Sequence, residues 1–172
     1  MILLLTGDFC TGKDTIANIM CQLEPTNTNK ILSYTTRAPR DEDDHLNHKF
    51  CTHDDFDKWN DWVARTEIDG EYYGARLSQF KPDNDMLNIY IVDEKGVNDV
   101  LAYEKNIDQD VAVVEVVRPI WMRNCPKERQ NRDKASFEAF PVDYRLFNDG
   151  DEYKLATACK ECLEYIHRVF GI

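Results

Sequence analysis

A glycine-rich segment near the start of the chain, Gly7 to Lys13, has the residue types and spacing of a phosphate-binding loop. It fits the pattern G-x-x-x-x-G-K, in which glycines let backbone N–H groups turn inward onto phosphate oxygens and the lysine reaches the β- and γ-phosphates. The alternative is a glycine turn that only joins a strand to a helix. We predict an ATP site with Lys13 as a catalytic cation. The residues expected to form it are Gly7, Asp8, Cys10, Thr11, Gly12, Lys13, Asp14 and Thr15.

Two aspartates are candidates for holding Mg²⁺ beside this loop. The pattern places Ser or Thr directly after the lysine as a Mg²⁺ ligand, whereas this chain has Asp14, followed by Thr15. Asp14 either caps the following helix, which stabilises a carboxylate by ~0.3–1 kcal/mol, or binds Mg²⁺ directly or through water. Asp93 follows an apolar run and either organises a Mg²⁺-bound water or forms a turn. We predict a Mg²⁺ site that uses both carboxylates.

Two arginines, Arg37 and Arg40, lie three residues apart on a segment stiffened by Pro39. Each guanidinium can bind a phosphate group through two parallel hydrogen bonds, so the pair suits a phosphate monoester. The alternative is a solvated loop whose arginines form salt bridges with the acidic residues 41–44. The spacing favours a site for the phosphate of an acceptor molecule.

A basic stretch late in the chain, residues 118–134, provides further cations. Phosphoryl transfer mainly requires alignment of donor and acceptor and neutralisation of the charge on the transferring group. We predict a short, mobile helical lid over residues 118–141, with Arg118 as a candidate and Arg123, Arg129 and Arg132 as catalytic arginines. The alternative is an exposed basic helix that pairs with Glu128 and Asp133.

Strands and helices must alternate to position these residues. Strand-length apolar runs occupy residues 1–6, 30–34, 88–92, 111–117 and 144–147, and helical spacing marks residues 15–23 and 151–170. The first run is apolar throughout, which is typical of a central strand buried on both faces. Residues 49–75 break the alternation and predict a short helix and a hairpin around Asp69 and Gly70. The pattern predicts a three-layer α/β P-loop fold with a mainly parallel sheet, a small antiparallel acceptor-binding insertion and a lid.

The chain length and charge narrow the choice further. With 172 residues we expect one domain: a core of residues 1–34, 76–117 and 142–172, an insertion at 35–75 and a lid at 118–141. The net charge of −11 opposes binding to nucleic acid and to anionic membranes, and no apolar run is long enough to span a bilayer. The six cysteines lack zinc-ligand spacing, so we expect reduced thiols and a cytoplasmic protein.

Two motifs together resemble those of the guanylate kinase family. Ser33 to Arg40 has the form S-x-T-T-R-x-P-R, and Gly70 to Gly74 has the form G-x-Y-Y-G. The similarity runs in order from Met1 to about Gly96 and resumes more weakly at Asp143 to Asp149. The resemblance implies that Ser33, Arg37, Arg40 and Tyr73 bind the acceptor phosphate. His48 aligns with a further phosphate-binding tyrosine of the family, and the alternative for it is a surface histidine.

The positions that recognise guanine in that family differ in this chain. Ala64 stands in place of a glutamate, Ala75 in place of a serine or threonine, and Ile91 in place of the first aspartate of a D-x-D motif. Glu67 or Asp69 could substitute, or simply solvate the hairpin. The segment Gly12 to Thr15 is similar to phage deoxynucleoside monophosphate kinases, and its first three residues are similar to ribose bisphosphate phosphokinases. The resemblance therefore leaves the acceptor open.

The sequence favours transfer of the γ-phosphoryl group of ATP, with Mg²⁺, to a nucleoside 5′-monophosphate such as GMP, dGMP or another deoxynucleotide. One alternative is a sugar-phosphate kinase of the ribose bisphosphate type. The other is a guanylate kinase-like domain that binds partners without catalysis. We expect small nucleotides as the partners, and a monomer or a homodimer.

Overall fold

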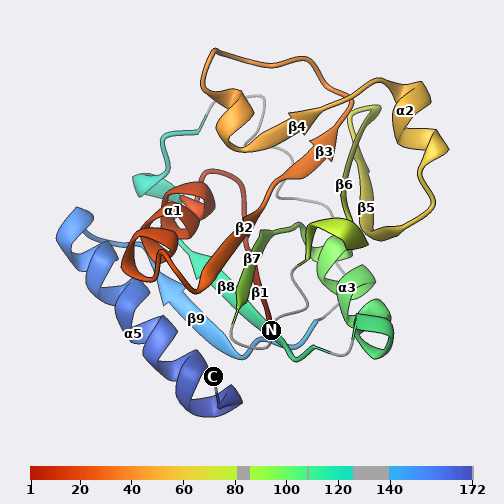
Figure 1. Ribbon diagram of the computed structural model, residues 1–172. Helices are drawn as coiled ribbons and strands as arrows, with labels where there is room; N and C mark the ends of the chain where they lie inside the picture. The colour runs from red at the N-terminus through yellow and green to blue at the C-terminus, as the bar shows by residue number, and fades with distance from the viewer. Residues whose placement is uncertain (81–85, 108, 126–139, 172) are drawn as a thin grey trace.

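A parallel sheet of five strands forms the centre of the computed structural model, which describes residues 1–80, 86–107, 109–125 and 140–171 (Figure 1). The strand order is β2-β7-β1-β8-β9, and every neighbouring pair is parallel. Carboxyl ends of parallel strands meet at one edge of the sheet, so the segments that follow β1, β7 and β8 come together there. The strands are β1 (Ile2–Thr6), β2 (Thr28–Ile31), β7 (Leu87–Ile91), β8 (Val111–Val117) and β9 (Tyr144–Phe147).

Strand β1 is central and fully buried, as its continuous apolar sequence predicts. Leu3 and Leu5 face a cluster that includes side chains of α1 and α5, whereas Ile2 and Leu4 face a cluster that includes side chains of α3. Helices therefore cover both faces of the sheet, and the predicted three-layer fold is confirmed. The helices are α1 (Lys13–Leu23), α2 (His53–Lys58), α3 (Glu94–Ile107) and α5 (Glu152–Phe170), with 3₁₀ turns η1 (Asp44–Leu46), η2 (Leu77–Gln79) and η3 (Ile120–Met122).

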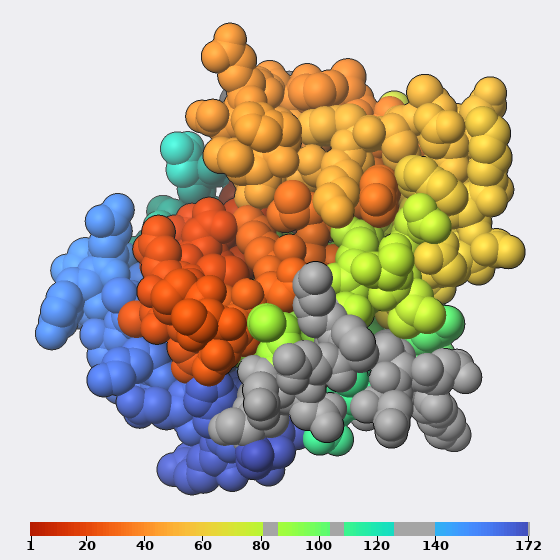
Figure 2. Space-filling view, in the orientation of Figure 1, coloured from red at the N-terminus to blue at the C-terminus, as the bar shows by residue number. Residues whose placement is uncertain are grey.

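A second, smaller sheet has the strand order β4-β3-β6-β5 and sits at one end of the molecule, above α1 in Figures 1 and 2. The predicted hairpin is present: β5 and β6 are antiparallel, and both Asp69 and Gly70 have positive φ in its turn. The prediction that the insertion is antiparallel is wrong in part, because β3 and β4 pair in parallel. Its strands are β3 (Ser33–Thr35), β4 (His48–Phe50), β5 (Trp62–Ile68) and β6 (Glu71–Arg76).

The apolar run at residues 30–34 is not one strand. Lys30 and Ile31 end β2, which pairs with β7 in the large sheet, whereas Ser33 begins β3 of the small sheet. This strand-length run contains no glycine or proline to mark a change of partner, and this is why the sequence predicted a single strand here. The change carries the chain directly from the core into the acceptor-side segment.

Across the described ranges, no helix is long and apolar enough to cross a membrane.

Candidate active site

The predicted phosphate-binding loop leaves the carboxyl end of β1 and enters α1. Gly7 has φ 131° and Gly12 has φ 91°, values that residues with a Cβ rarely adopt. Space is also restricted: a Cβ on Gly7 would overlap the carbonyl oxygen of Val116, and one on Gly12 would lie 2.6 Å from Nδ2 of Asn148. Both glycines are therefore required by conformation and by packing. The loop sits at the N-terminus of α1, where backbone N–H groups and the helix dipole favour an anion.

The Lys13 side chain arches back over this loop. Its Nζ donates to the carbonyl oxygens of Gly7 and Asp8, at 2.7 Å each. The far side of the loop is held by Asn148, whose Nδ2 donates to the Thr11 carbonyl at 2.8 Å from a buried position. Asn148 directly follows β9, within the segment that carries the weaker family resemblance. Its role as a support of the loop could not be found from the sequence, because 137 residues separate the two bonded groups.

The segment after β8 is tied to the phosphate-binding loop by two links. Arg123 Nη2 donates to Asp8 Oδ2 at 2.5 Å, and a disulfide joins Cys10 to Cys125 with their Cα atoms 5.5 Å apart. The prediction of reduced cysteines is wrong for this pair, because a spacing of 115 residues gives no sign that the fold brings the two together. Arg118 donates to the Met122 carbonyl within the same segment. Arg129 and Arg132 lie outside the described residues, so the helical lid remains a prediction.

Both aspartates proposed for Mg²⁺ line the same cavity as the loop. Asp14 is in the first turn of α1, where a carboxylate is favoured by the helix dipole; its Oδ1 lies 4.0 Å from Lys30 Nζ and its side chain is 59% exposed. Asp93 Oδ1 accepts from the Gly96 N–H at 2.7 Å, so it also caps the start of α3. Mg²⁺ is commonly bound by one or two carboxylates together with substrate phosphates. The donor set therefore fits Mg²⁺, and among the described residues no group of three His, Cys, Asp or Glu could hold a metal by itself.

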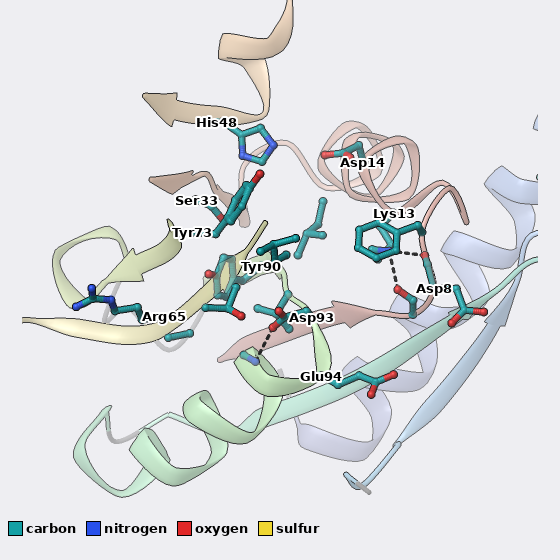
Figure 3. Close-up of a pocket in the computed structure, with 18 of the residues that line it drawn as sticks. Asp8, Lys13, Asp14, Ser33, His48, Arg65, Tyr73, Tyr90, Asp93 and Glu94 are labelled. Atoms are coloured by element: carbon teal, nitrogen blue, oxygen red, sulfur yellow. Dashed lines mark hydrogen bonds between the residues drawn. The ribbon is translucent and has the colours of Figure 1, made fainter. Parts of the chain in front are cut away.

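Strand register brings most of the predicted acceptor-phosphate residues together. Ser33 of β3 pairs directly with His48 of β4, and Thr35, next on the same face of β3, pairs with Tyr73 of β6. The rings of His48 and Tyr73 meet edge to face, with centroids 6.1 Å apart. Ser33, His48 and Tyr73 lie across the cavity from Lys13 (Figure 3), and Arg40 lines the same cavity. The fold thus brings together Ser33, His48 and Tyr73 from three strands of the small sheet and Arg40 from the loop between β3 and β4.

Arg37 is placed differently from its predicted partner Arg40. It is buried, and its guanidinium is bound by Asp44, with Nη1 2.5 Å from Oδ2 and Nη2 2.9 Å from Oδ1. The Arg37 guanidinium lowers the pKa of Asp44 well below its ordinary value, and Asp44 in turn raises the pKa of Arg37. The two Nη groups of Arg37, which the sequence assigned to an acceptor phosphate, therefore donate to the Asp44 carboxylate. Arg40, three residues later, is exposed at the cavity.

His48 is poised as a neutral group at this site. Burial, followed by the charge of Arg37, lowers its pKa below the ordinary value of 6.5, whereas Asp44 and Asp14 act in the opposite direction. Its Nδ1 is buried and has no hydrogen-bond partner among the described residues. A half-buried ring facing a cavity is consistent with the predicted binding role and differs from an exposed surface histidine.

The wall of the cavity beyond the phosphate residues is mostly apolar. Ala64 and Ala75 are register partners in the hairpin, and Ala64 lines the cavity together with Ile68 and Ile91. Thr66 and Arg65 of β5 add polar residues to this wall. Glu67 pairs with Tyr72 in the hairpin, and neither residue lines the cavity. Glu67 is not placed to replace the missing glutamate.

Tyr90 is a further residue of the wall that the sequence did not single out. It is buried in β7, lines the cavity and hydrogen bonds with Ser33, while burial raises the pKa of its phenol. Its signal in the sequence is only that of a core strand residue. The complete cavity has a volume of about 250 Å³ and extends from Lys13 to Tyr73 and Ile68.

Comparisons with known proteins identify the fold. A guanylate kinase from Anaplasma phagocytophilum matches with a TM-score of 0.63 and 19% identity, over 100% of this chain and 96% of that one. The APS kinase of Mycobacterium tuberculosis, in complex with AMPPNP and APS, matches with a TM-score of 0.55 and 13% identity, over 96% of each chain. No protein-family model and no curated protein sequence matches the chain. The chain therefore has a guanylate kinase-like P-loop fold, in a divergent sequence.

Proposed function

We propose that this protein is a kinase that transfers the γ-phosphoryl group of ATP to a nucleoside 5′-monophosphate. One observation carries the proposal: a single cavity is lined on one side by the phosphate-binding loop with Lys13 and on the other by Ser33, Arg40, His48 and Tyr73. Two phosphate-binding surfaces that face one another can align a donor and an acceptor, which is the main requirement of phosphoryl transfer. The likeness to kinases of this fold supports the proposal.

Different residues would bind the phosphates of ATP and the phosphate of the acceptor. The loop N–H groups would bind the β- and γ-phosphates, and Lys13 would leave its two carbonyl partners to neutralise charge on the transferring group. Arg40, His48 and the hydroxyl groups of Ser33 and Tyr73 would hold the acceptor phosphate. Arg123 is already joined to the loop through Asp8 and would add a cation on the donor side.

Asp14 and Asp93 would hold Mg²⁺ at the same cavity. When bound, Mg²⁺ would supply positive charge that neutralises part of the charge on the phosphate groups. For this chain the two aspartates have separate structural tasks as well, because Asp14 faces Lys30 and Asp93 caps α3. We propose nucleotides as the partners of the protein, whereas the Cys10–Cys125 disulfide removes the reduced-thiol argument for a cytoplasmic location.

A coupled assay of ATP consumption tests the function. The acceptors are all ribo- and deoxynucleoside monophosphates and ribose bisphosphate, and Lys13→Ala is the inactive control. We expect turnover of GMP, dGMP or another deoxynucleotide without sharp preference for guanine, because Ala64, Ala75 and Ile91 offer no polar group to reject the wrong base. Sharp preference for GMP would contradict this expectation.

The apolar wall also favours a second candidate. A cavity without base-recognising side chains at Ala64 and Ile91 suits a sugar phosphate, which has no base to recognise. Turnover of ribose bisphosphate alone would identify this activity. Binding of ATP with no turnover of any acceptor would instead favour a domain that binds partners without catalysis.

A further inference from the structure

Asp44 lies at the centre of the acceptor-side loop and has a role that the cavity residues do not explain. It begins η1, is 8% exposed and does not line the cavity. Its carboxylate accepts three hydrogen bonds: two from the Arg37 guanidinium, and one from the backbone N–H of Arg40 at 2.8 Å. The Asp44 carboxylate thus binds both arginines of the motif. It accepts from the guanidinium of Arg37 and from the backbone N–H of Arg40.

The bonds of Asp44 are of the strong kind. Hydrogen bonds between a guanidinium and a carboxylate carry charge on both partners, and the paired geometry fixes the orientation of both planes. A buried carboxylate that loses its partner raises the free energy of the folded state. Breaking this ion pair is therefore strongly unfavourable. Both Nη groups of Arg37 are therefore bound to Asp44.

Arg37 passes this constraint on to the strands of the small sheet. It hydrogen bonds with the side chain of Tyr73 on β6, and its guanidinium stacks over the ring of Phe50 on β4, 5.4 Å from the ring centroid. The Arg40 backbone is held by the same carboxylate. Asp44 thereby fixes the loop that presents Arg40 and the tyrosine that stands beside His48.

We propose that Asp44 is a positioning residue of the acceptor-phosphate site. It makes Arg37 part of the scaffold, and this scaffold sets Arg40 and Tyr73 to face the cavity with Ser33 and His48. The inference rests on the proposed function, and it assigns to Arg37 an indirect role in place of the direct phosphate contact that the sequence predicts.

The direction in which Asp44→Asn changes the acceptor KM distinguishes a positioning role for Asp44 from two other roles. A carboxylate near a bound phosphate repels it, and a carboxylate on Arg37 competes with phosphate for that fork. If Asp44 did only these things, Asp44→Asn would lower the acceptor KM. If Asp44 positions the site, Asp44→Asn raises the acceptor KM by about tenfold or more, the range expected when a charge-assisted hydrogen bond is lost. The ATP KM should change by less than about twofold.

The experiment measures both KM values and kcat for Asp44→Asn, with the acceptor turned over best by the unaltered protein. Asp43→Asn is the matched control, because Asp43 is the preceding residue, is exposed and loses the same charge. Arg37→Lys keeps the charge but loses the fork, so it should reproduce the selective rise. The double variant should be no worse than the more affected single variant, because the two residues act as one unit.

Thermal unfolding of each variant accompanies the kinetics. If Asp44→Asn does not fold, Arg37→Lys and Asp44→Glu carry the same test. An acceptor KM that falls, or that matches the value for Asp43→Asn, overturns the inference while leaving the kinase proposal intact. Equal loss in both KM values and kcat also overturns it, since that indicates general damage. An unaltered protein that turns over no acceptor overturns both.

Discussion

The two sides of the cavity are built in opposite ways. The donor side consists mainly of one continuous segment, Gly7 to Lys13, whose glycines and lysine specify its shape locally. The acceptor side collects Ser33, Arg40, His48 and Tyr73 from two strands, a loop and a third strand, and Asp44 organises them from behind. Removing one donor residue should therefore affect the chemistry directly, whereas changes on the acceptor side should act mainly through geometry.

The largest expected effect is that of Lys13→Ala. Loss of the ammonium that neutralises the transferring group should lower kcat by about a thousandfold or more, without unfolding the protein. Steady-state rates and a thermal unfolding curve measure the two parts. Lys58→Ala is the control, because Lys58 is an exposed lysine of α2. Equal rates for Lys13→Ala and the unaltered protein would remove the loop from the mechanism.

The arginines of the segment after β8 come next. Arg123 binds Asp8 of the phosphate-binding loop, and in the proposed mechanism its guanidinium stabilises charge on the transferring phosphoryl group, so Arg123→Ala should lower kcat by ~10²–10³-fold. Arg129→Ala and Arg132→Ala are measured separately by the same assay. Near-unaltered kcat values for all three variants would refute the role of this segment in catalysis.

The Cys10–Cys125 disulfide is a long-range link on the donor side, which otherwise consists mainly of one continuous segment. Closing a loop of this length restricts the unfolded chain, so Cys125→Ser should lower the free energy of unfolding by about 2–4 kcal/mol under oxidising conditions. Urea unfolding with and without a dithiol reductant measures it. Cys125→Ser is its own control, because the reductant should then have no further effect. Identical curves for both proteins would show that the bond does not form in solution.

Arg40→Lys tests the acceptor side directly. An ammonium cannot replace the two parallel hydrogen bonds of a guanidinium, so the acceptor KM should rise about tenfold while the ATP KM stays nearly constant. Initial rates at varied acceptor and varied ATP measure this split. Arg145→Lys on β9, an exposed arginine paired with Glu115, is the matched control. Impairment for ATP alone would assign Arg40 to the donor side.

The smallest effect concerns acid stability. The folded state lowers the pKa of Asp44, so its contribution to stability is complete above the ordinary Asp pKa of about 4 and is lost as the pH falls toward the lowered value. The stability gap between the unaltered protein and Asp44→Asn should therefore be wide at pH 7 and narrower at pH 3. Urea unfolding at both pH values checks it, and a constant gap would contradict the assignment.

The sequence by itself determined the features that depend on neighbours along the chain. The mostly buried strands β1, β7 and β8 follow from strand-length apolar runs, and the shape of the phosphate-binding loop follows from Gly7 and Gly12, because φ preference is a property of the single residue. The hairpin turn at Asp69 and Gly70 was predictable for the same reason. These features need no knowledge of the rest of the fold.

Only the tertiary structure decided which distant groups meet. The chain changes sheets between Ile31 and Ser33, and Cys10 reaches Cys125 across 115 residues. Residues 41–44 are all acidic, and nothing in their order along the chain selects Asp44 as the partner of Arg37. Such pairings depend on strand order and burial, which desolvate one carboxylate and leave its neighbours in water.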